Sequence, residues 1–134
     1  MAYGWGEHVG ELVLWVQAGT EEGVFTEALR GMAELLADEA PGGPAPSEWR
    51  EVDVRGDDRA RLFAAWLEEL AFLAETEGFV PDAVAELALE PRTLRARVGG
   101  HRGAPPHLVK AVTLHDLRFE PAADGWRARA LLDV

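Results

Sequence analysis

The chain has 134 residues, a length that suits one domain with its own hydrophobic core, and we expect a single domain over residues 1–134. Its composition, with 48% hydrophobic and 28% charged residues, is typical of a globular protein rather than a disordered one. The absence of cysteine excludes disulfides and thiolate metal sites, and a formal net charge of −11 disfavours direct binding to nucleic acid or to an anionic membrane.

The location and partners of the chain are partly indicated by its ends and its charge. No apolar run approaches the length that crosses a bilayer, and the N-terminal segment MAYGWGEHVGE lacks the basic and apolar regions of a signal peptide. An acidic surface suits basic proteins or divalent cations, although acidity also simply keeps a protein in solution. We expect a cytoplasmic protein without membrane contact, as a monomer or a weak homo-oligomer.

The segment ELVLWVQA, residues 11–18, is predicted to be a strand because apolar side chains alternate along it. Leu14 and Val16 would face one way, and Glu11 and Trp15 the other. With Trp15 turned away from the helices, the aromatic residues near the N-terminus suggest an exposed protein-binding patch.

A helix is predicted to follow, with Thr20 as its N-cap and acidic residues in its first turn. Its apolar residues recur at helical spacing and are Val24, Phe25, Ala28, Leu29, Met32, Leu35 and Leu36. The helix should end near Ala40, because the segment PGGPAPS cannot continue it.

The segment WREVDVRG, residues 49–56, is predicted to be a charged strand near the edge of a sheet. Asp57 is the expected N-cap of a second helix, and Gly78 is its expected C-terminal stop. The apolar stripe of this helix comprises Leu62, Phe63, Trp66, Leu67, Leu70 and Leu73.

The rest of the chain is predicted to be mostly strand, with turns at Pro91 and at the segments GGHRGAPP and EPAADG. The expected strands span roughly 83–90, 92–98, 108–119 and 125–134. Two early amphipathic helices and a closing antiparallel hairpin predict the α+β class. We expect a two-layer sandwich in which both helices cover one face of a mostly antiparallel sheet.

The closing hairpin allows a prediction of which side chains share a face. The apolar face of its first strand comprises Val109, Ala111, Leu117 and Phe119, and His115 lies among them as an expected core histidine. Matching this face to the apolar face of the last strand puts Lys110 and Asp133 on the same side of the sheet, away from the helices. A register that sets Phe119 opposite Trp126 would also pair Asp116 with Arg129.

The neighbourhood of Lys110 and Asp133 has two interpretations. One is a surface salt bridge worth about 0–1 kcal/mol, with no functional role. The other is a functional cluster, because Lys110 is the only lysine in a chain with twelve arginines and Glu11 lies on the polar face of its own strand. Alternation alone leaves both interpretations open.

Three segments resemble a known family. Residues 109–134, VKAVTLHDLRFEPAADGWRARALLDV, closely resemble the C-terminal signature of archease, a small activating partner of RtcB-type RNA ligases in tRNA splicing and RNA repair. Residues 62–79 look like the archease helix that carries a W-L-x-E-L motif, and residues 7–29 are similar to the opening strand and first helix of the family. The resemblance covers nearly the whole chain and implies a protein that promotes guanylylation and multiple turnover of the ligase.

The resemblance also implies site residues. Glu11, Asp133 and Val134 match the positions at which archeases bind a divalent ion, typically calcium, with magnesium as the other candidate. Such a hard cation takes several oxygen ligands, which two carboxylates and the α-carboxylate of Val134 would supply. Lys110 matches the functional lysine of V-K-A-V-T, which would balance this charge or reach a phosphate of the partner's nucleotide.

One position departs from the family pattern. Archeases usually open with H-T-A-D, whereas residues 8–11 here read H-V-G-E, so Glu11 extends its carboxylate by a methylene and puts the metal site in question. An alternative function is a small metal-dependent enzyme that uses Glu11, Asp133 and Lys110. It lacks a general base of suitable pKa, and a site at a chain end would be poorly enclosed.

Overall fold

The computed structural model describes residues 1–8, 10–37, 45–103 and 109–134, and this part of the chain forms two helices and seven strands. The elements in chain order are β1 (Ala2–His8), β2 (Glu11–Ala18), α1 (Glu21–Ala37), β3 (Glu48–Arg55), α2 (Arg59–Glu77), β4 (Phe79–Leu89), β5 (Thr93–Arg102), β6 (Ala111–Ala122) and β7 (Gly125–Asp133). The predicted helix end near Ala40, the strand start at 108 and the residue His107 lie outside the described residues.

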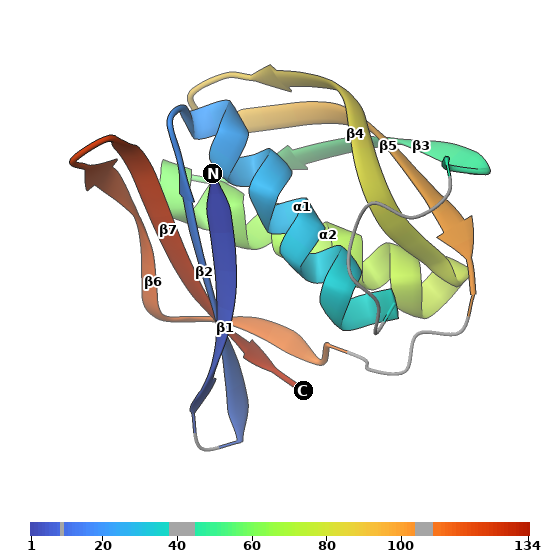
Figure 1. The fold of residues 1–134 in the computed structure, drawn as a ribbon, viewed down its shortest axis with the longest axis horizontal. Coiled ribbons are helices and arrows are strands. Elements are labelled where there is room, and N and C mark those ends of the chain that lie inside the picture. Colours follow the sequence, from blue (N-terminus) through green and yellow to red (C-terminus); the bar gives the residue numbers. More distant parts are fainter. Residues whose placement is uncertain (9, 38–44, 104–108) are drawn as a thin grey trace.

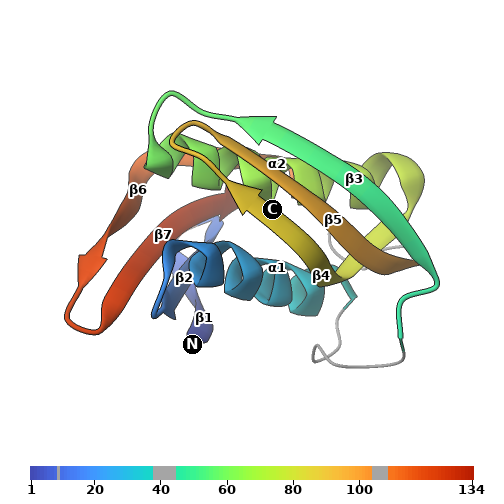
Figure 2. The same ribbon diagram turned by 90° about the horizontal axis from the view of Figure 1, so that it is seen from above.

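The strands form two antiparallel sheets with the helices between them (Figures 1 and 2). One sheet has the order β1-β2-β7-β6, and the other has the order β3-β5-β4. Both helices contact strands of both sheets. The predicted α+β class, with two helices and antiparallel strands, is confirmed. The prediction of a single sheet with both helices on one face is wrong. The strands form two sheets, and the inner face of each sheet packs against the same pair of helices.

The helix ends largely follow the expected capping residues. The side-chain oxygen of Thr20 accepts a hydrogen bond from the backbone N–H of Gly23 at 3.0 Å, as an N-cap of α1 should. The N-cap of α2 is Asp58 rather than the predicted Asp57, and its carboxylate accepts from the backbone N–H of Arg61 at 2.8 Å. Gly78 ends α2 in the left-handed conformation at φ 63°, which glycine adopts without steric cost.

The core lies between the helix pair and the two sheets. Trp66 on α2 is fully buried and donates its indole N–H to the carbonyl oxygen of Phe25 on α1 at 2.9 Å. Phe25, Phe63 and Phe119 contact one another with ring centroids 5.5–5.9 Å apart, and the ring of Phe25 lies 6.5 Å from that of Trp66. Since Trp66 and the leucines of the W-L-x-E-L segment are all buried, this motif has a structural role. No helix in the described ranges combines the length and apolar character needed to cross a bilayer.

Strand β1 was not predicted, and it changes the interpretation of the N-terminal aromatic residues. Its partner is β2, and Tyr3 and Trp5 face inward, where they pack against the core. The hydroxyl of Tyr3 donates to the carboxylate of Glu34 on α1. Burial, together with this bond, raises the pKa of Tyr3 to about 12. Of the proposed aromatic patch, only Trp15 is therefore exposed, at 42%.

The closing hairpin has a bulge that alternation did not predict. Phe119 faces Ala128 rather than Trp126, whereas Thr113 faces Leu131. Five residue steps from 113 to 118 on β6 match two steps from 131 to 129 on β7, so β6 accommodates three extra residues. A shift by an odd number exchanges the faces of the strand. Consequently Val112 is buried and Ala111 is exposed, and the predicted core residue His115 is exposed as well.

Candidate functional site

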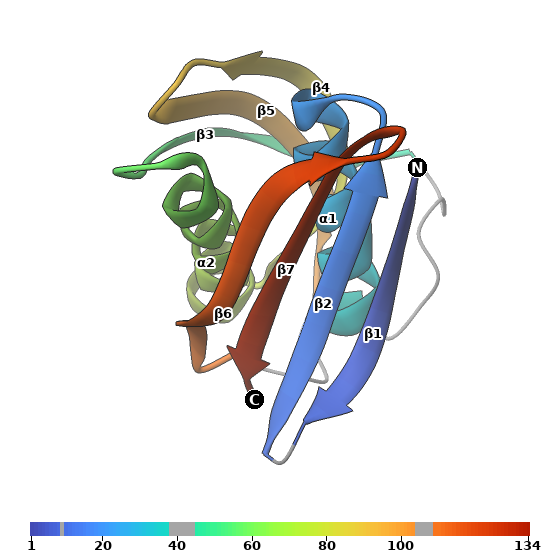
Figure 3. The ribbon, with the colours of Figure 1, turned by 90° about the vertical axis from the view of Figure 1, so that its left-hand side faces the viewer.

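Asp133 lies where three segments meet at one end of the β1-β2-β7-β6 sheet (Figure 3). On one side it faces Glu11 of β2, and on the other it faces Ala111 of β6. This position follows from the central place of β7 between β2 and β6. The predicted convergence of residues 11, 110 and 133 is therefore consistent with the strand pairing.

Glu11 and Asp133 supply two carboxylates on the outer face of the sheet. Leu14 and Val16 of β2 are buried against the helices, so the alternate residue Glu11 points away from them. Directly opposed residues on antiparallel strands have Cβ atoms about 4.5–5.5 Å apart. Both residues are half-buried. Two carboxylates at this spacing fit a shared hard cation, which several oxygen ligands must surround.

The described side chains provide only part of a coordination shell. No group of three or more acidic or histidine side chains in the described ranges converges as a metal site. Val134 follows Asp133 directly and is 39% exposed. Further ligands would have to come from Val134, from water or from a partner.

Lys110 reaches this end of the sheet by a route different from the predicted one. It precedes β6, and its backbone N–H donates to the carbonyl oxygen of Asp133 at 2.7 Å. Because of the bulge, Ala111 rather than Lys110 shares the face of Asp133. The prediction that Lys110 and Asp133 lie on the same side of the sheet is therefore wrong. The side chain of Lys110 is exposed, and its backbone lies beside that of Asp133.

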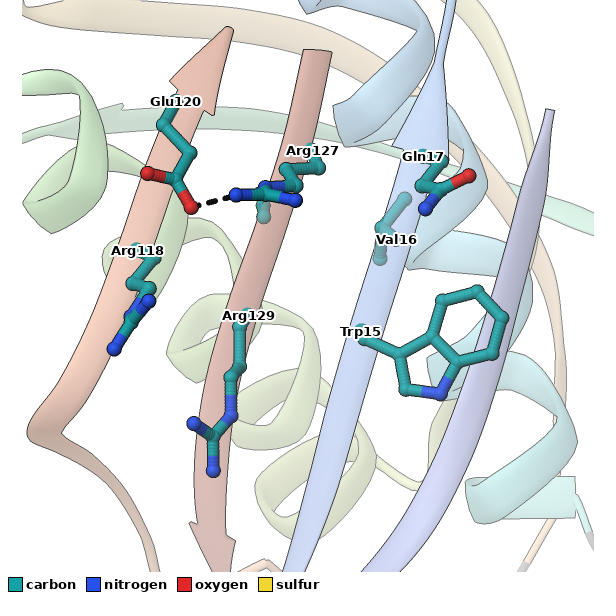
Figure 4. Close-up of a pocket in the computed structure, with 8 residues that line it drawn as sticks. Trp15, Val16, Gln17, Arg118, Glu120, Arg127 and Arg129 are labelled. Carbon is teal, nitrogen blue, oxygen red and sulfur yellow. Dashed lines mark hydrogen bonds and ion pairs between the residues drawn. The ribbon is translucent and has the colours of Figure 1, made fainter. Parts of the chain in front are cut away.

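A second feature on the same outer face is a groove of about 290 Å³. We call it the arginine–tryptophan groove, and its outward side chains are Trp15, Gln17, Arg118, Glu120, Arg127 and Arg129 (Figure 4). These residues come from three neighbouring strands, β2, β7 and β6. Alternation along β7 places Arg127 and Arg129 on the face of Asp133, but it does not indicate a groove.

Ion pairs link the arginines of this groove to two carboxylates. Arg129 lies 3.2 Å from Asp116, as the sequence predicted, and Arg118 lies 3.5 Å from the same residue. Arg127 lies 3.0 Å from Glu120. Partial desolvation would raise the pKa of Asp116, but the charges of Arg129 and Arg118 outweigh it and hold that pKa below its ordinary value.

Comparison with known families gives a match over almost the whole chain. The family model described as the Archease protein family (MTH1598/TM1083) matches residues 3–134. The protein archease of Methanopyrus kandleri is 32% identical, and the alignment covers 96% of each chain. The protein archease of Thermococcus gammatolerans is 31% identical, with 96% of this chain and 95% of the relative covered.

Solved structures share the fold. The solution structure of Methanobacterium thermoautotrophicum protein 1598 matches with a TM-score of 0.73, 22% identity and 98% coverage of both chains. The crystal structure of an archease from Thermotoga maritima, described as a possible chaperone, matches with a TM-score of 0.65 and 21% identity. That alignment covers 96% of this chain and 94% of the other. At these identities the likeness concerns the fold alone.

Proposed function

Because this chain belongs to the archease family, we propose that it is the activating partner of an RtcB-type RNA ligase. In this role it promotes guanylylation of the ligase and its repeated turnover in tRNA splicing and RNA repair, and it catalyses no reaction itself. The acidic charge of −11 supports a role in protein contact rather than in direct RNA binding.

One observation carries the proposal: Asp133 faces Glu11 across β2 and β7, and its carbonyl oxygen accepts the backbone N–H of Lys110. Three segments of the chain thus meet at one end of this sheet, with Glu11 and Asp133 on its outer face and the backbone of Lys110 beside them. The resemblance to archeases implied a functional set of the same residues. A surface salt bridge between Lys110 and Asp133 alone would not require that Glu11, from a third segment, lie at the same place.

We further propose that Glu11, Asp133 and Val134 hold a divalent cation, calcium in preference to magnesium. When bound, the cation supplies positive charge that offsets the repulsion between the carboxylates. Glu11 and Asp133 differ in length by one methylene, and calcium tolerates such irregular ligand sets better than magnesium, which demands near-ideal octahedral geometry.

Lys110 would act on the partner as a compact positive charge. Its side chain is exposed, so the ammonium group is free to extend toward a docked protein. A lysine presents a point charge on a flexible stem, whereas arginine presents a planar fork with different reach. We therefore expect Lys110→Arg to bind the ligase but to activate it less well.

The test mixes the purified chain with its cognate RtcB-type ligase, GTP and an RNA with broken ends. Multiple-turnover ligation should rise well above that of the ligase alone, and Asp133→Asn and Lys110→Arg should reduce the gain. Asp53→Asn, which removes an exposed carboxylate from β3, serves as the matched control and should leave the gain unchanged. The absence of any gain with the unaltered chain and the correct ligase would refute the proposal.

A further inference from the structure

We propose that the arginine–tryptophan groove docks an acidic segment of the protein partner. The inference rests on the proposed function in one respect only, the identification of that partner as the ligase. The groove lies on the outer face of the β1-β2-β7-β6 sheet, which no described element covers (Figure 3).

The aromatic part of the groove is rigidly supported. Gly4 on β1 faces Trp15 on β2, and a Cβ atom added at Gly4 would lie 2.1 Å from the Cζ2 atom of the indole. The indole ring of Trp15 therefore lies directly over Gly4, and the other side of the ring is partly open to solvent (Figure 4). Tryptophan in such a position contributes a large contact area to a partner.

Most of the large exposed apolar side chains belong to this sheet or adjoin it. The large exposed hydrophobic residues of the described chain are Met1, Trp15, Phe72, Leu114 and Val134. All except Phe72, which lies on α2, are in or next to strands of the β1-β2-β7-β6 sheet. Of these residues, Trp15 lines the groove, where it is a large exposed apolar side chain among arginines.

The charge of the groove identifies the kind of partner. Arg118, Arg127 and Arg129 face only two carboxylates, Asp116 and Glu120, which leaves an excess of one positive charge on a strongly acidic chain. Ion pairs between exposed groups contribute little to stability, so a partner's carboxylates can replace them at small cost. Arginine and tryptophan, unlike lysine, are enriched in protein interfaces.

The outer face of the other sheet has the opposite balance. A groove there is lined by three glutamates, Glu51, Glu86 and Glu90, and by two arginines, Arg95 and Arg97. The positive excess is thus a property of the arginine–tryptophan groove and not of every outer sheet face. A long RNA would extend beyond this groove into the negative field of the remaining surface, whereas an acidic protein segment need contact the groove alone.

The groove is also placed to serve the candidate site. Trp15 faces Arg129, and four residues along the same two strands Glu11 faces Asp133. At about 3.4 Å per residue, the two features are about 14 Å apart. A partner docked on the groove therefore reaches Asp133 and its neighbours without leaving the sheet face.

The first experiment measures the Kd of the ligase for groove variants by isothermal titration. The double variant Arg127→Ala/Arg129→Ala and the single variant Trp15→Ala should each weaken binding about tenfold or more, as central interface residues do. The matched controls are Arg95→Ala on the other sheet and Phe72→Ala on α2, both exposed, and they should change Kd by less than about twofold. Thermal unfolding confirms that each variant is folded.

The second experiment identifies what occupies the groove. A photo-crosslinking amino acid in place of Gln17 should attach to a segment of the ligase rich in aspartate and glutamate. Crosslinks to RNA, to a second copy of this chain or to a basic segment would overturn the inference, as would groove variants that bind the ligase normally. In that last case the proposed function stands if ligation is still activated. If the unaltered chain does not bind the ligase, both proposals fail.

Discussion

A double-mutant cycle of Glu11→Gln and Asp133→Asn tests whether the two facing carboxylates form a cation site. Without divalent ions the two charges repel each other, so each single substitution should relieve repulsion and the coupling should be destabilising. With calcium, each single substitution should remove the bound ion, so the coupling should become stabilising. The cycle cancels other contacts of either residue, because these appear equally in its single and double variants.

The strand pairing sets the size of the effect. For two unit charges about 5 Å apart, Coulomb's law gives about 0.8 kcal/mol in water and about 3 kcal/mol at an effective dielectric constant of 20. Both residues are half-buried at the sheet end, so we expect about 1 kcal/mol of repulsion. Calcium at about a hundred times its Kd adds about 2.7 kcal/mol to the stability of the native protein. The coupling should therefore shift by about 2.7 kcal/mol and change sign.

The assay is urea unfolding followed by tryptophan fluorescence, with EDTA or with calcium at constant ionic strength, and with unchanged m-values as the condition for comparison. A cycle at Glu51 and Arg97, which face each other in the other sheet, is the control and should not respond to calcium. A coupling at Glu11 and Asp133 that is the same with and without calcium would refute the site.

Three further predictions concern the fold that positions this site. Trp66→Phe should lower the free energy of unfolding by about 2 kcal/mol, of which about 1 comes from the lost hydrogen bond to Phe25 and about 1 from the cavity. Chemical denaturation measures this loss, and a loss no larger than that of the exposed Trp15→Phe would contradict the prediction. Asp58→Ala should cost about 1 kcal/mol at pH 7, against about 0–0.5 for Asp57→Ala. The hydrogen bond from the backbone N–H of Arg61 lowers the pKa of Asp58. The stabilisation by Asp58 should accordingly be complete above its unfolded pKa, near 3.9, and should vanish as pH falls through its lower folded pKa. A difference in stability between the unaltered protein and Asp58→Ala that does not change with pH would count against the cap. Tyr3 is the only tyrosine, so tyrosinate absorbance should show a midpoint near pH 12 in the folded protein and near 10 in urea. Because the folded pKa is raised, this stabilisation is present below pH 10 and lost as pH rises toward 12, and an ordinary midpoint in the folded state would exclude the buried contact with Glu34.

The helices and most strands could be predicted because local chemistry determines them. Thr20 and Gly78 mark helix ends through hydrogen bonding and backbone conformation that hold in any tertiary context. Strand β1 could not be recognised, because Gly4 and Gly6 occupy its outer positions and interrupt the apolar alternation. Alternation also cannot distinguish one sheet from two, since a residue that faces a helix layer looks the same in either case.

The candidate site could be predicted only as a set of residues, not as a geometry. The bulge in β6 depends on Asp116, which adopts φ 55°, and no pattern in the sequence marks that backbone conformation. The bulge exchanges the faces of Ala111 and Val112, and the side of the sheet predicted for this end of β6 is therefore wrong. The arginine–tryptophan groove arises from strands that are neighbours only after folding, and its ion pair between Asp116 and Arg129 survived an incorrect register.

The position of β7 has a consequence for biosynthesis. Strand β7 follows the other described strands in the chain but lies in the interior of its sheet, so β2 and β6 each lack a neighbour on one side until it has been translated. A nascent polypeptide would expose two unpaired strand edges to solvent and to chaperones during that interval. A chain truncated before Gly125 would consequently lack both the central strand of this sheet and Asp133.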